Sequence, residues 1–119
     1  MRDDNQNLIV ELTFEFSLKI IEFTELLYER KKFNLSHQLF KAGTSIGANV
    51  REAQNAESKD DFIHKMKIAA KEADETEYWL LLCHHSKSYP DPNDLPIKIK
   101  SILRVLSKII SGSLDVTVR

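Results

Sequence analysis

Residues 58–86 read SKDDFIHKMKIAAKEADETEYWLLLCHHS, and this stretch decides the fold class. Its apolar and small residues recur at spacings of 4, 3, 4, 3, 4 and 3, the heptad rhythm of a helix that packs along its whole length. They are Phe62, Met66, Ala69, Ala73, Thr76, Leu80 and Cys83. Ser58 can cap the free amides at the start of such a helix, and Asp60 and Asp61 suit its positive end. The stretch predicts one long helix over about residues 59–86.

A helix is also predicted over about residues 5–32. One apolar row has the spacing of a helix face and consists of Ile9, Leu12, Phe16, Ile20, Phe23 and Leu27. A second apolar row lies to one side of the first and consists of Leu8, Phe14, Leu18, Ile21 and Tyr28. Together the two rows make an apolar sector wider than one partner helix can cover. We therefore expect part of this helix to face another molecule.

The segment before the long helix predicts a helix over about residues 35–57, with Asn34 or Ser36 as its N-cap. Its apolar stripe is Leu35, Leu39, Ala42, Ile46, Val50 and Ala53. Residues 42–49 read AGTSIGAN and are unusually small for a helix. Each interior glycine costs about 1 kcal/mol relative to alanine, so we expect another helix to approach this stretch closely. The alternative is a break or kink near Gly43.

The last helix is predicted over about residues 95–111. The run SYPDPND, residues 88–94, ends the preceding helix because two prolines cannot continue it. Asp94 can cap the new helix, Pro96 is tolerated in its first turn, and Gly112 is a suitable stop. Its inward residues are Ile99, Ile102, Leu106 and Ile109. Short connections then predict an all-α domain over residues 1–112, an antiparallel up-down-up-down four-helix bundle. Residues 113–119 are expected to be a loose tail.

Composition supports a single helical domain. The chain has 119 residues and a mass of 13.8 kDa, enough for one independent core. Only three glycines and three prolines argue against an all-β fold with frequent turns. The single Cys83 excludes an intramolecular disulfide and suits a reducing cytosol. No apolar run is long enough to span a membrane, and the acidic start of the sequence does not resemble a signal peptide. We therefore expect a cytoplasmic protein with no membrane partner.

The sequence offers little for metal or cofactor chemistry. A di-metal bundle needs a Glu-x-x-His motif on each of two helices, whereas the nearest motif here is a single Asp61-Phe62-Ile63-His64. Cys83, His84 and His85 are adjacent, but neighbouring helical positions point about 100° apart and cannot converge on one ion. Cys83 continues the apolar stripe and is expected to be buried. We expect no metal, no cofactor, no small-molecule substrate and no catalytic residue, so the protein is not expected to be an enzyme.

Three carboxylates on the long helix raise a further alternative, which is a buried active-site acid. Glu72 and Glu75 share a side of the helix, whereas Glu77 projects elsewhere. Glu75 is adjacent to Thr76 in the apolar stripe, and partial burial would require a hydrogen-bond donor. The candidate donors are Asn49, Arg51, Thr44 and Ser45. No nucleophile accompanies Glu75, so a role in specific helix packing is favoured.

The net charge of −1 predicts no general attraction to nucleic acid, but basic residues gather near the C-terminus. Lys100, Arg104 and Lys108 recur every four residues, with Lys98 nearby. A solvated helix face explains this row. The alternative is a row of phosphate contacts, weak in one copy and added together by repetition around a ring.

Tyr78 and Trp79 lie beside the run Leu80-Leu81-Leu82 and widen the apolar coverage of the long helix. They fit either the core or an inter-subunit surface, because tyrosine and tryptophan are enriched at such contacts. The excess apolar surface on this helix and on the first favours self-association.

These residues also carry a family resemblance. Leu39, the run KAGTSIGANVREA at residues 41–53, Asp61-Phe62 and the run AAKEADETEYWL at residues 69–80 strongly resemble bacterial four-helix bundle proteins encoded by intervening sequences within 23S ribosomal RNA genes. These are called 23S rRNA-intervening sequence proteins. The likeness extends over about residues 12–112, nearly the whole domain.

The resemblance implies a homopentameric, barrel-like ring. It also implies a relation to the accessory variability determinant of diversity-generating retroelements, a pentamer that works with a reverse transcriptase and contacts nucleic acid. The matching positions look like packing and assembly determinants: Ser45, Ile46, Gly47, Asn49, Glu52, Glu75 and Trp79, to which we add Tyr78. The retroelement proteins are markedly basic, whereas this chain is slightly acidic. We therefore expect a non-catalytic bundle that acts by assembly, with RNA or DNA binding through residues 98–108 as the alternative.

Overall fold

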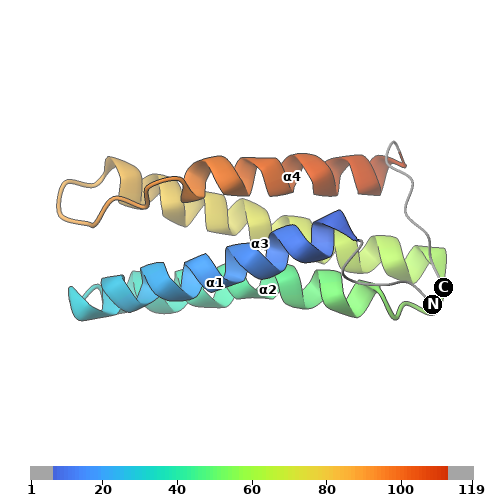
Figure 1. The fold of residues 1–119 in the computed structure, drawn as a ribbon, viewed down its shortest axis with the longest axis horizontal. Helices are drawn as coiled ribbons and strands as arrows, with labels where there is room; N and C mark the ends of the chain where they lie inside the picture. The colour runs from blue at the N-terminus through green and yellow to red at the C-terminus, as the bar shows by residue number, and fades with distance from the viewer. Residues whose placement is uncertain (1–6, 113–119) are drawn as a thin grey trace.

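The structure is a computed structural model that describes residues 7–112. The described residues form four helices and no strands: α1 (Leu8–Glu29), α2 (Phe33–Ala53), α3 (Lys59–His85) and α4 (Leu95–Ser111). In Figure 1 the colour gradient passes from right to left along α1, back along α2, left again along α3 and right along α4. The predicted helix start at residue 5 and the predicted loose tail at residues 113–119 lie outside the described residues.

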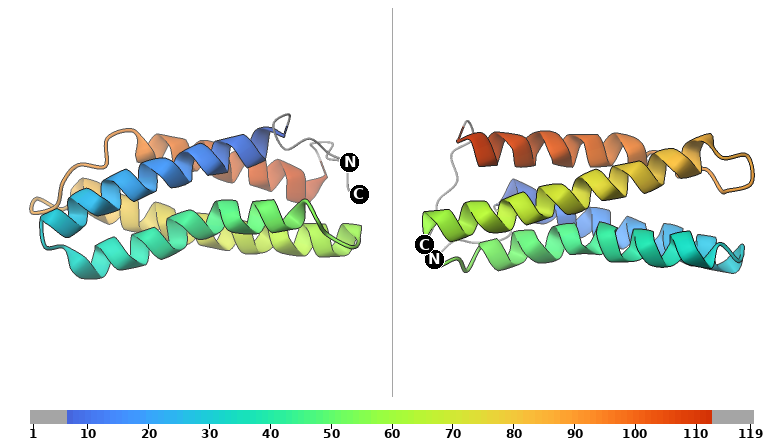
Figure 2. Two further views of the ribbon diagram at one scale, coloured as in Figure 1. Left: turned by 60° about the horizontal axis from the view of Figure 1, so that its bottom comes forward. Right: turned by 180° about the vertical axis from the view of Figure 1, so that it is seen from behind.

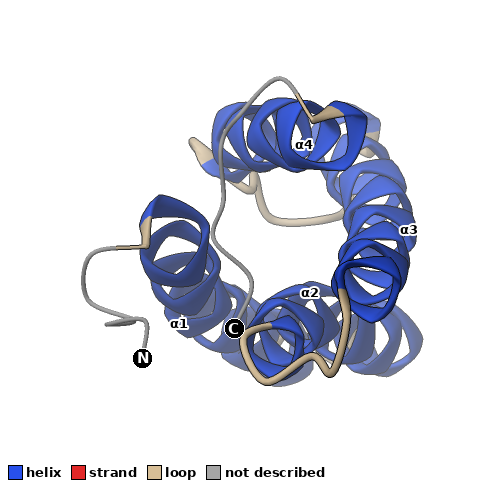
Figure 3. Ribbon diagram, turned by 90° about the vertical axis from the view of Figure 1, so that its right-hand side faces the viewer, coloured by secondary structure: helices blue, strands red, loops and turns tan. Residues whose placement is uncertain are grey.

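The helices pack around one shared core. Viewed end-on, α1 and α3 stand on opposite sides, with α2 and α4 between them (Figure 3). Packing is densest between α2 and α3 and between α1 and α2, and it is sparsest between α1 and α4. The diagonal pairs α1–α3 and α2–α4 lie farther apart, with no α carbons within 8 Å of one another. The two views of Figure 2 agree that α2 and α3 lie side by side over most of their length.

The predicted apolar stripes supply the core. All seven stripe residues of α3 are buried, as are the four predicted inward residues of α4. The predicted stripe residues of α1 and α2 are also buried, except Leu12 and Leu35, which are half-buried. These residues were selected by helical periodicity alone, so their burial confirms that the sequence pattern predicts the core.

The start of α3 and both ends of α4 lie where the sequence predicts. The Ser58 hydroxyl accepts a hydrogen bond from the Asp61 amide at 3.0 Å, as expected of an N-cap. Pro96 occupies the first turn of α4, and Gly112 ends it in the left-handed region at φ 81°. Asp94 is the N-cap residue of α4 as predicted, but its side chain makes no capping hydrogen bond and instead lies 3.7 Å from the Lys98 ammonium.

The boundaries of α2 differ from the prediction at both ends. The helix begins at Phe33 after Lys32, so neither Asn34 nor Ser36 is its N-cap. It ends at Ala53 rather than at residue 57, in a tight turn where the amides of residues 54–56 bond to carbonyls three residues earlier. No glycine or proline marks this turn. Burial of Ala56 against the core supports it, and that contact is a tertiary effect.

The end of α1 also lies earlier than predicted. The helix stops at Glu29 because Lys31 adopts a left-handed conformation with φ 62°. The Lys32 amide bonds to the Leu27 carbonyl and the Lys31 amide to the Tyr28 carbonyl, the two bonds of a Schellman motif. Glycine normally occupies this position, so a lysine there does not indicate a helix end.

A candidate assembly surface on the bundle

Two glycines bring the backbone of α2 against α1. A Cβ atom at Gly43 would lie 2.9 Å from both Cγ1 and Cγ2 of Ile20. A Cβ atom at Gly47 would lie 3.2 Å from the Ser17 hydroxyl and 3.2 Å from the Thr13 carbonyl oxygen. The predicted close helix–helix contact is confirmed, and its partner is α1. The alternative of a break near Gly43 is wrong, because α2 is continuous through that residue.

Hydroxyl groups along this seam bond to backbone carbonyls rather than to a ligand. Thr13 donates to the Ile9 carbonyl and Ser17 to the Thr13 carbonyl, each at 2.8 Å. Ser36 reaches across to the Thr24 carbonyl at 2.8 Å and ties α2 to α1. Within residues 7–112 no buried side-chain polar atom lacks a hydrogen-bond partner. The buried polar groups of this seam therefore take part in the packing of α1 against α2.

The motif residues of α2 divide between core and surface. Ile46 is fully buried. The half-buried Ser45 donates to the Lys41 carbonyl at 2.6 Å, and the half-buried Asn49 donates to the Ser45 carbonyl at 2.9 Å. The exposed Glu52 carboxylate lies 3.2 Å from the Lys65 ammonium of α3. These contacts serve packing within the bundle.

The carboxylates of α3 do not form a buried acid site. Glu75 is exposed, and its Oε2 accepts a hydrogen bond from Trp79 Nε1 at 3.0 Å. The predicted partial burial of Glu75 and its candidate donors on α2 are therefore wrong, because one step of about 100° from Thr76 carries residue 75 out of the core. Glu72 is half-buried, and burial, together with the nearby Glu75 charge, raises its pKa while Lys41 lowers it.

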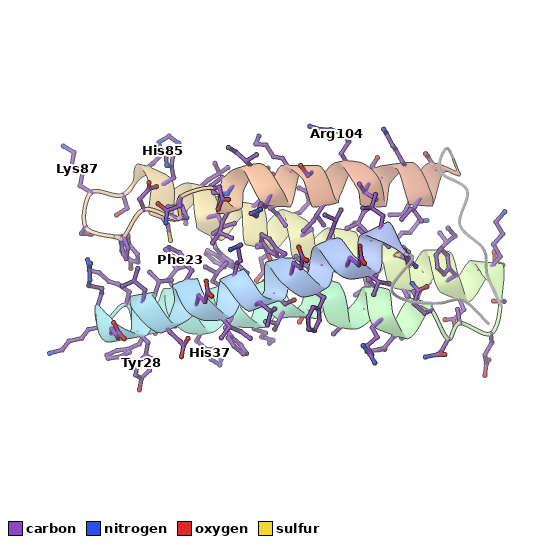
Figure 4. All side chains as sticks on the ribbon, viewed as in Figure 1. Phe23, Tyr28, His37, His85, Lys87 and Arg104 are labelled. Atoms are coloured by element: carbon purple, nitrogen blue, oxygen red, sulfur yellow. The ribbon has the colours of Figure 1, made fainter. Side chains whose placement is uncertain are left out.

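An apolar groove of about 600 Å³ runs along the outer side of α1 and α2. Its apolar walls are Ile21 and Tyr28 from α1 and Phe33 and Phe40 from α2. The Tyr28 and Phe33 rings meet edge to face with centroids 4.8 Å apart. Tyr28 is 64% exposed and points away from the bundle (Figure 4). The sequence predicted the α1 side of this surface but not the contribution of Phe33 and Phe40, although a seven-residue spacing links them.

A second groove, of about 430 Å³, lies on the other side of α2, against α3. Leu35, Leu82, Trp79 and Tyr89 form most of its wall. Trp79 is half-buried, whereas Tyr78 is 57% exposed, and their rings lie 5.4 Å apart. The two grooves share Asn34 and Gln38 as lining residues. Apolar surface therefore continues around α2 from the outer side of α1 to the outer side of α3.

The basic row of α4 faces outward and is partly neutralised. The Lys98 ammonium lies 3.7 Å from Asp94, and the Lys100 ammonium lies 3.7 Å from Glu77 on α3. Arg104 projects away from the bundle (Figure 4), and Lys108 is exposed on the same side of the helix. The row exists as the sequence indicated, with two of its charges engaged by carboxylates.

The Cys83-His84-His85 triplet spreads around α3. Cys83 is 1% exposed, and burial raises its pKa to about 11. His84 Nδ1 lies 3.3 Å from Asp91 in the following loop, and the His85 side chain is exposed. Among the described residues no group of three or more histidine, cysteine or acidic side chains could hold a metal ion. No helix within residues 7–112 has the length and apolar character needed to cross a membrane.

Comparison with known proteins adds the family. The family model described as 23S rRNA-intervening sequence protein matches residues 5–112. The chain belongs to this family. A crystal structure of a protein of unknown function from the S23 ribosomal protein family of Bacteroides thetaiotaomicron VPI-5482 is 39% identical, with a TM-score of 0.80. The likeness covers 86% of this chain and 97% of that one. No curated protein matches the sequence significantly.

Proposed function

We propose that this protein acts without catalysis, as a homo-oligomer of up-down-up-down bundles whose assembly presents surfaces to a bacterial cytoplasmic partner. The observation that carries the proposal is the apolar surface around α2. Phe14, Tyr28 and Tyr78 are each more than half exposed, at 60%, 64% and 57%. One groove lies between α1 and α2, and the other lies between α2 and α3. Large exposed apolar patches on a soluble bundle are typical of protein–protein contacts.

A pentameric ring is the assembly that the family resemblance favours. The apolar surface reaches two different outer sides of the bundle, one on α1 and one on α3. Contacts between two different faces of identical chains form rings when the rotation closes. The assembly and packing residues in this proposal are those of the α2 and α3 motifs: Ser45, Ile46, Gly47, Asn49, Glu52, Glu75, Tyr78 and Trp79.

Sedimentation velocity and light scattering at micromolar concentration test the proposal. A pentamer has five times the 13.8 kDa mass of one chain. Phe40→Asp and Leu82→Asp place a charge in each groove and are expected to lower the mass towards that of the monomer. Ile97→Asp is the matched control, because Ile97 is 69% exposed on α4 outside both grooves. A monomeric parent protein would overturn the proposal.

Nucleic-acid binding is a second candidate function, supported by the exposed Arg104 and Lys108 on one side of α4. The carboxylates beside Lys98 and Lys100 reduce the attraction of the row for phosphate. Binding of single-stranded or double-stranded RNA or DNA is expected to fall with salt. Replacing Lys100, Arg104 and Lys108 by glutamate should weaken it. Equal binding by this triple variant, or none by the parent at low salt, would exclude the candidate.

A further inference from the structure

α1 carries a heptad seam on its outer side, separate from the row that enters the core. The seam has spacings of 3, 4, 3, 4 and 3, the pattern of a helix that packs against a partner helix. We call these residues the α1 outer seam: Glu11, Phe14, Leu18, Ile21, Glu25 and Tyr28. All six are exposed. No helix of the same chain covers this seam, although its pattern is that of a covered one.

α3 carries an outer row that begins with two lysines, with the exposed Asp74 and Glu75 beside it between Lys71 and Tyr78. We call it the α3 outer seam: Lys67, Lys71, Tyr78 and Leu82. Its members are spaced 4, 7 and 4 residues apart, and all are exposed. Apolar residues dominate the later part of the α1 outer seam, where Glu25 is the one acidic residue. Near their start both seams have charged residues: Glu11 and the neighbouring Glu15 on α1, and Lys67 and Lys71 on α3. None of these four charged side chains has an ionic partner within residues 7–112.

The two seams lie at matching heights along the bundle. At one end of α2, Gln54 accepts a hydrogen bond from Asn7 of α1 at 2.8 Å, and the Glu52 carboxylate lies 3.2 Å from Lys65 of α3. Glu11 follows Asn7 by about one turn, and Lys67 follows Lys65 by less than one. The acidic and basic ends of the two seams are therefore level.

The apolar ends of the seams are level at the other end of α2. The Tyr28 ring packs on Phe33, the first residue of α2. Leu82 lines a groove with Asn34 and Leu35, in the same turn of α2. Because α1 and α3 stand on opposite sides of the bundle (Figure 3), one chain cannot bring its own seams together. A neighbouring copy, rotated about an axis parallel to the helices, keeps each seam at its own height.

We propose that the α1 outer seam of one copy docks on the α3 outer seam of the next, with Glu11 and Glu15 facing Lys67 and Lys71 and with Ile21 and Tyr28 facing Tyr78 and Leu82. The proposal rests on the assembly proposed above and specifies its interface. The lysine stems also cover Phe14 and Leu18 while their ammonium groups reach the carboxylates. The charges set the register of the contact, and the aromatic and leucine residues supply most of the buried apolar area.

The geometry also favours a closed ring over an open filament. Ile21 and Tyr28 line the groove between α1 and α2, and Leu82 lines the groove between α2 and α3. Both seams are therefore turned towards α2. As a result, the docking face on α1 and the docking face on α3 do not point in directly opposite directions. Each successive copy then turns towards the side of α2. A repeated turn closes into a ring when successive copies stay level along the helix axes, as the matching heights of the seams allow.

Charge reversal tests the register. Glu11→Lys/Glu15→Lys places four like charges at each interface, as does Lys67→Glu/Lys71→Glu, and each double variant is expected to weaken assembly on the order of tenfold or more. The quadruple variant that carries both changes restores opposite charges and should restore the parent mass in sedimentation velocity. Arg104→Glu/Lys108→Glu is the matched control for the lysine double variant, with the same charge change on exposed α4 residues away from both seams.

Cysteine cross-linking tests the contact directly. Leu18→Cys/Lys71→Cys places thiols on opposite sides of one chain, so mild oxidation can link them only between copies. We expect a ladder of covalent oligomers on a denaturing gel, ending at the ring number. Leu18→Cys/Arg104→Cys is the control and should remain mostly uncross-linked. The parent protein, oxidised in the same way, is the control for any cross-link through its own Cys83, which is buried.

The outcomes separate the two proposals. A monomeric parent would overturn both the assembly and its interface. An oligomeric parent that tolerates both charge reversals, and that cross-links no better through Lys71→Cys than through Arg104→Cys, would overturn the interface alone. Assembly lost in each double variant and regained in the quadruple variant, together with the ladder, would establish the docking of α1 on α3.

Discussion

The α carbon of Gly43 packs directly on the side chain of Ile20, so that a single added methyl group has no room. A Cβ atom would stand 2.9 Å from Cγ1 and Cγ2 of Ile20, both branch atoms close to the α1 backbone. Ile20 is fully buried and cannot swing aside. The glycine therefore fixes the distance between α1 and α2, and with it the width of the outer groove that both helices line.

Gly43→Ala is expected to destabilise the fold despite the better helix propensity of alanine. Overpacking costs about 1–3 kcal/mol, against a propensity gain of about 1 kcal/mol. Urea unfolding measures the difference. Ile20→Ala also destabilises the protein by creating a cavity, but the double variant should lose less than the sum of the two because the alanine methyl group fills part of it. Strict additivity would refute the contact.

Lys31→Gly is expected to stabilise the protein by about 0.5–1 kcal/mol. Lys31 holds a φ of 62°, which glycine adopts without the steric cost paid by other residues. Arg30→Gly is the control: Arg30 has φ −83°, so glycine only adds freedom to the unfolded chain and should destabilise. Thermal or urea unfolding of the two variants should shift in opposite directions. A loss of stability in Lys31→Gly would contradict the Schellman motif.

Asn7 joins the start of α1 to the end of α2, and its two roles can be separated. Its Oδ1 accepts from the Ile9 amide at 3.2 Å as the N-cap of α1, and its Nδ2 donates to Gln54 Oε1 at 2.8 Å. Asn7→Ala removes both bonds and should cost about 1–3 kcal/mol. Asn7→Asp keeps the capping acceptor and loses only the donor, so its loss should be smaller. Equal losses would mean that the cap contributes nothing.

Cys83 is expected to resist thiol reagents at neutral pH in the folded protein. Burial raises the pKa of Cys83 from its ordinary value of 9.0 to about 11, so almost no thiolate is present at pH 8. The unfolded chain releases this proton more readily than the folded chain. The contribution of Cys83 to stability should therefore be complete below about pH 9 and decline between about pH 9 and 11.

Two measurements check the behaviour of Cys83. Labelling with a chromogenic disulfide should be slow in buffer and fast in denaturant. The stability of Cys83→Ala should fall less between pH 9 and 11 than that of the parent, because the lysines and tyrosines titrate in both proteins and cancel in the comparison. Rapid labelling of the native protein would show that the Cys83 side chain is accessible.

The sequence by itself determined the helical fold class and the core. The heptad spacing from Phe62 to Cys83 and the 3.6-residue rows of the other helices select inward residues without reference to any neighbour, since the periodicity is a property of one helix. The small residues at Gly43 and Gly47 likewise predicted that another helix packs closely against this segment. The outward apolar residues Phe14, Leu18 and Tyr28 were also legible, because they exceed what one partner helix can cover.

Only the tertiary structure decided where helices stop and which side chains meet. The left-handed Lys31 and the turn after Ala53 carry no glycine or proline, so their positions follow from packing rather than from local preference. Glu75 pairs with Trp79 on its own helix instead of with α2. One position along α3 separates the exposed Glu75 from the buried Thr76, so only the packing of the helix decides which of the two faces the core. The heights of Glu11 and Lys67 depend on how α1 and α3 each pack on α2, a relation between distant segments that no local pattern contains.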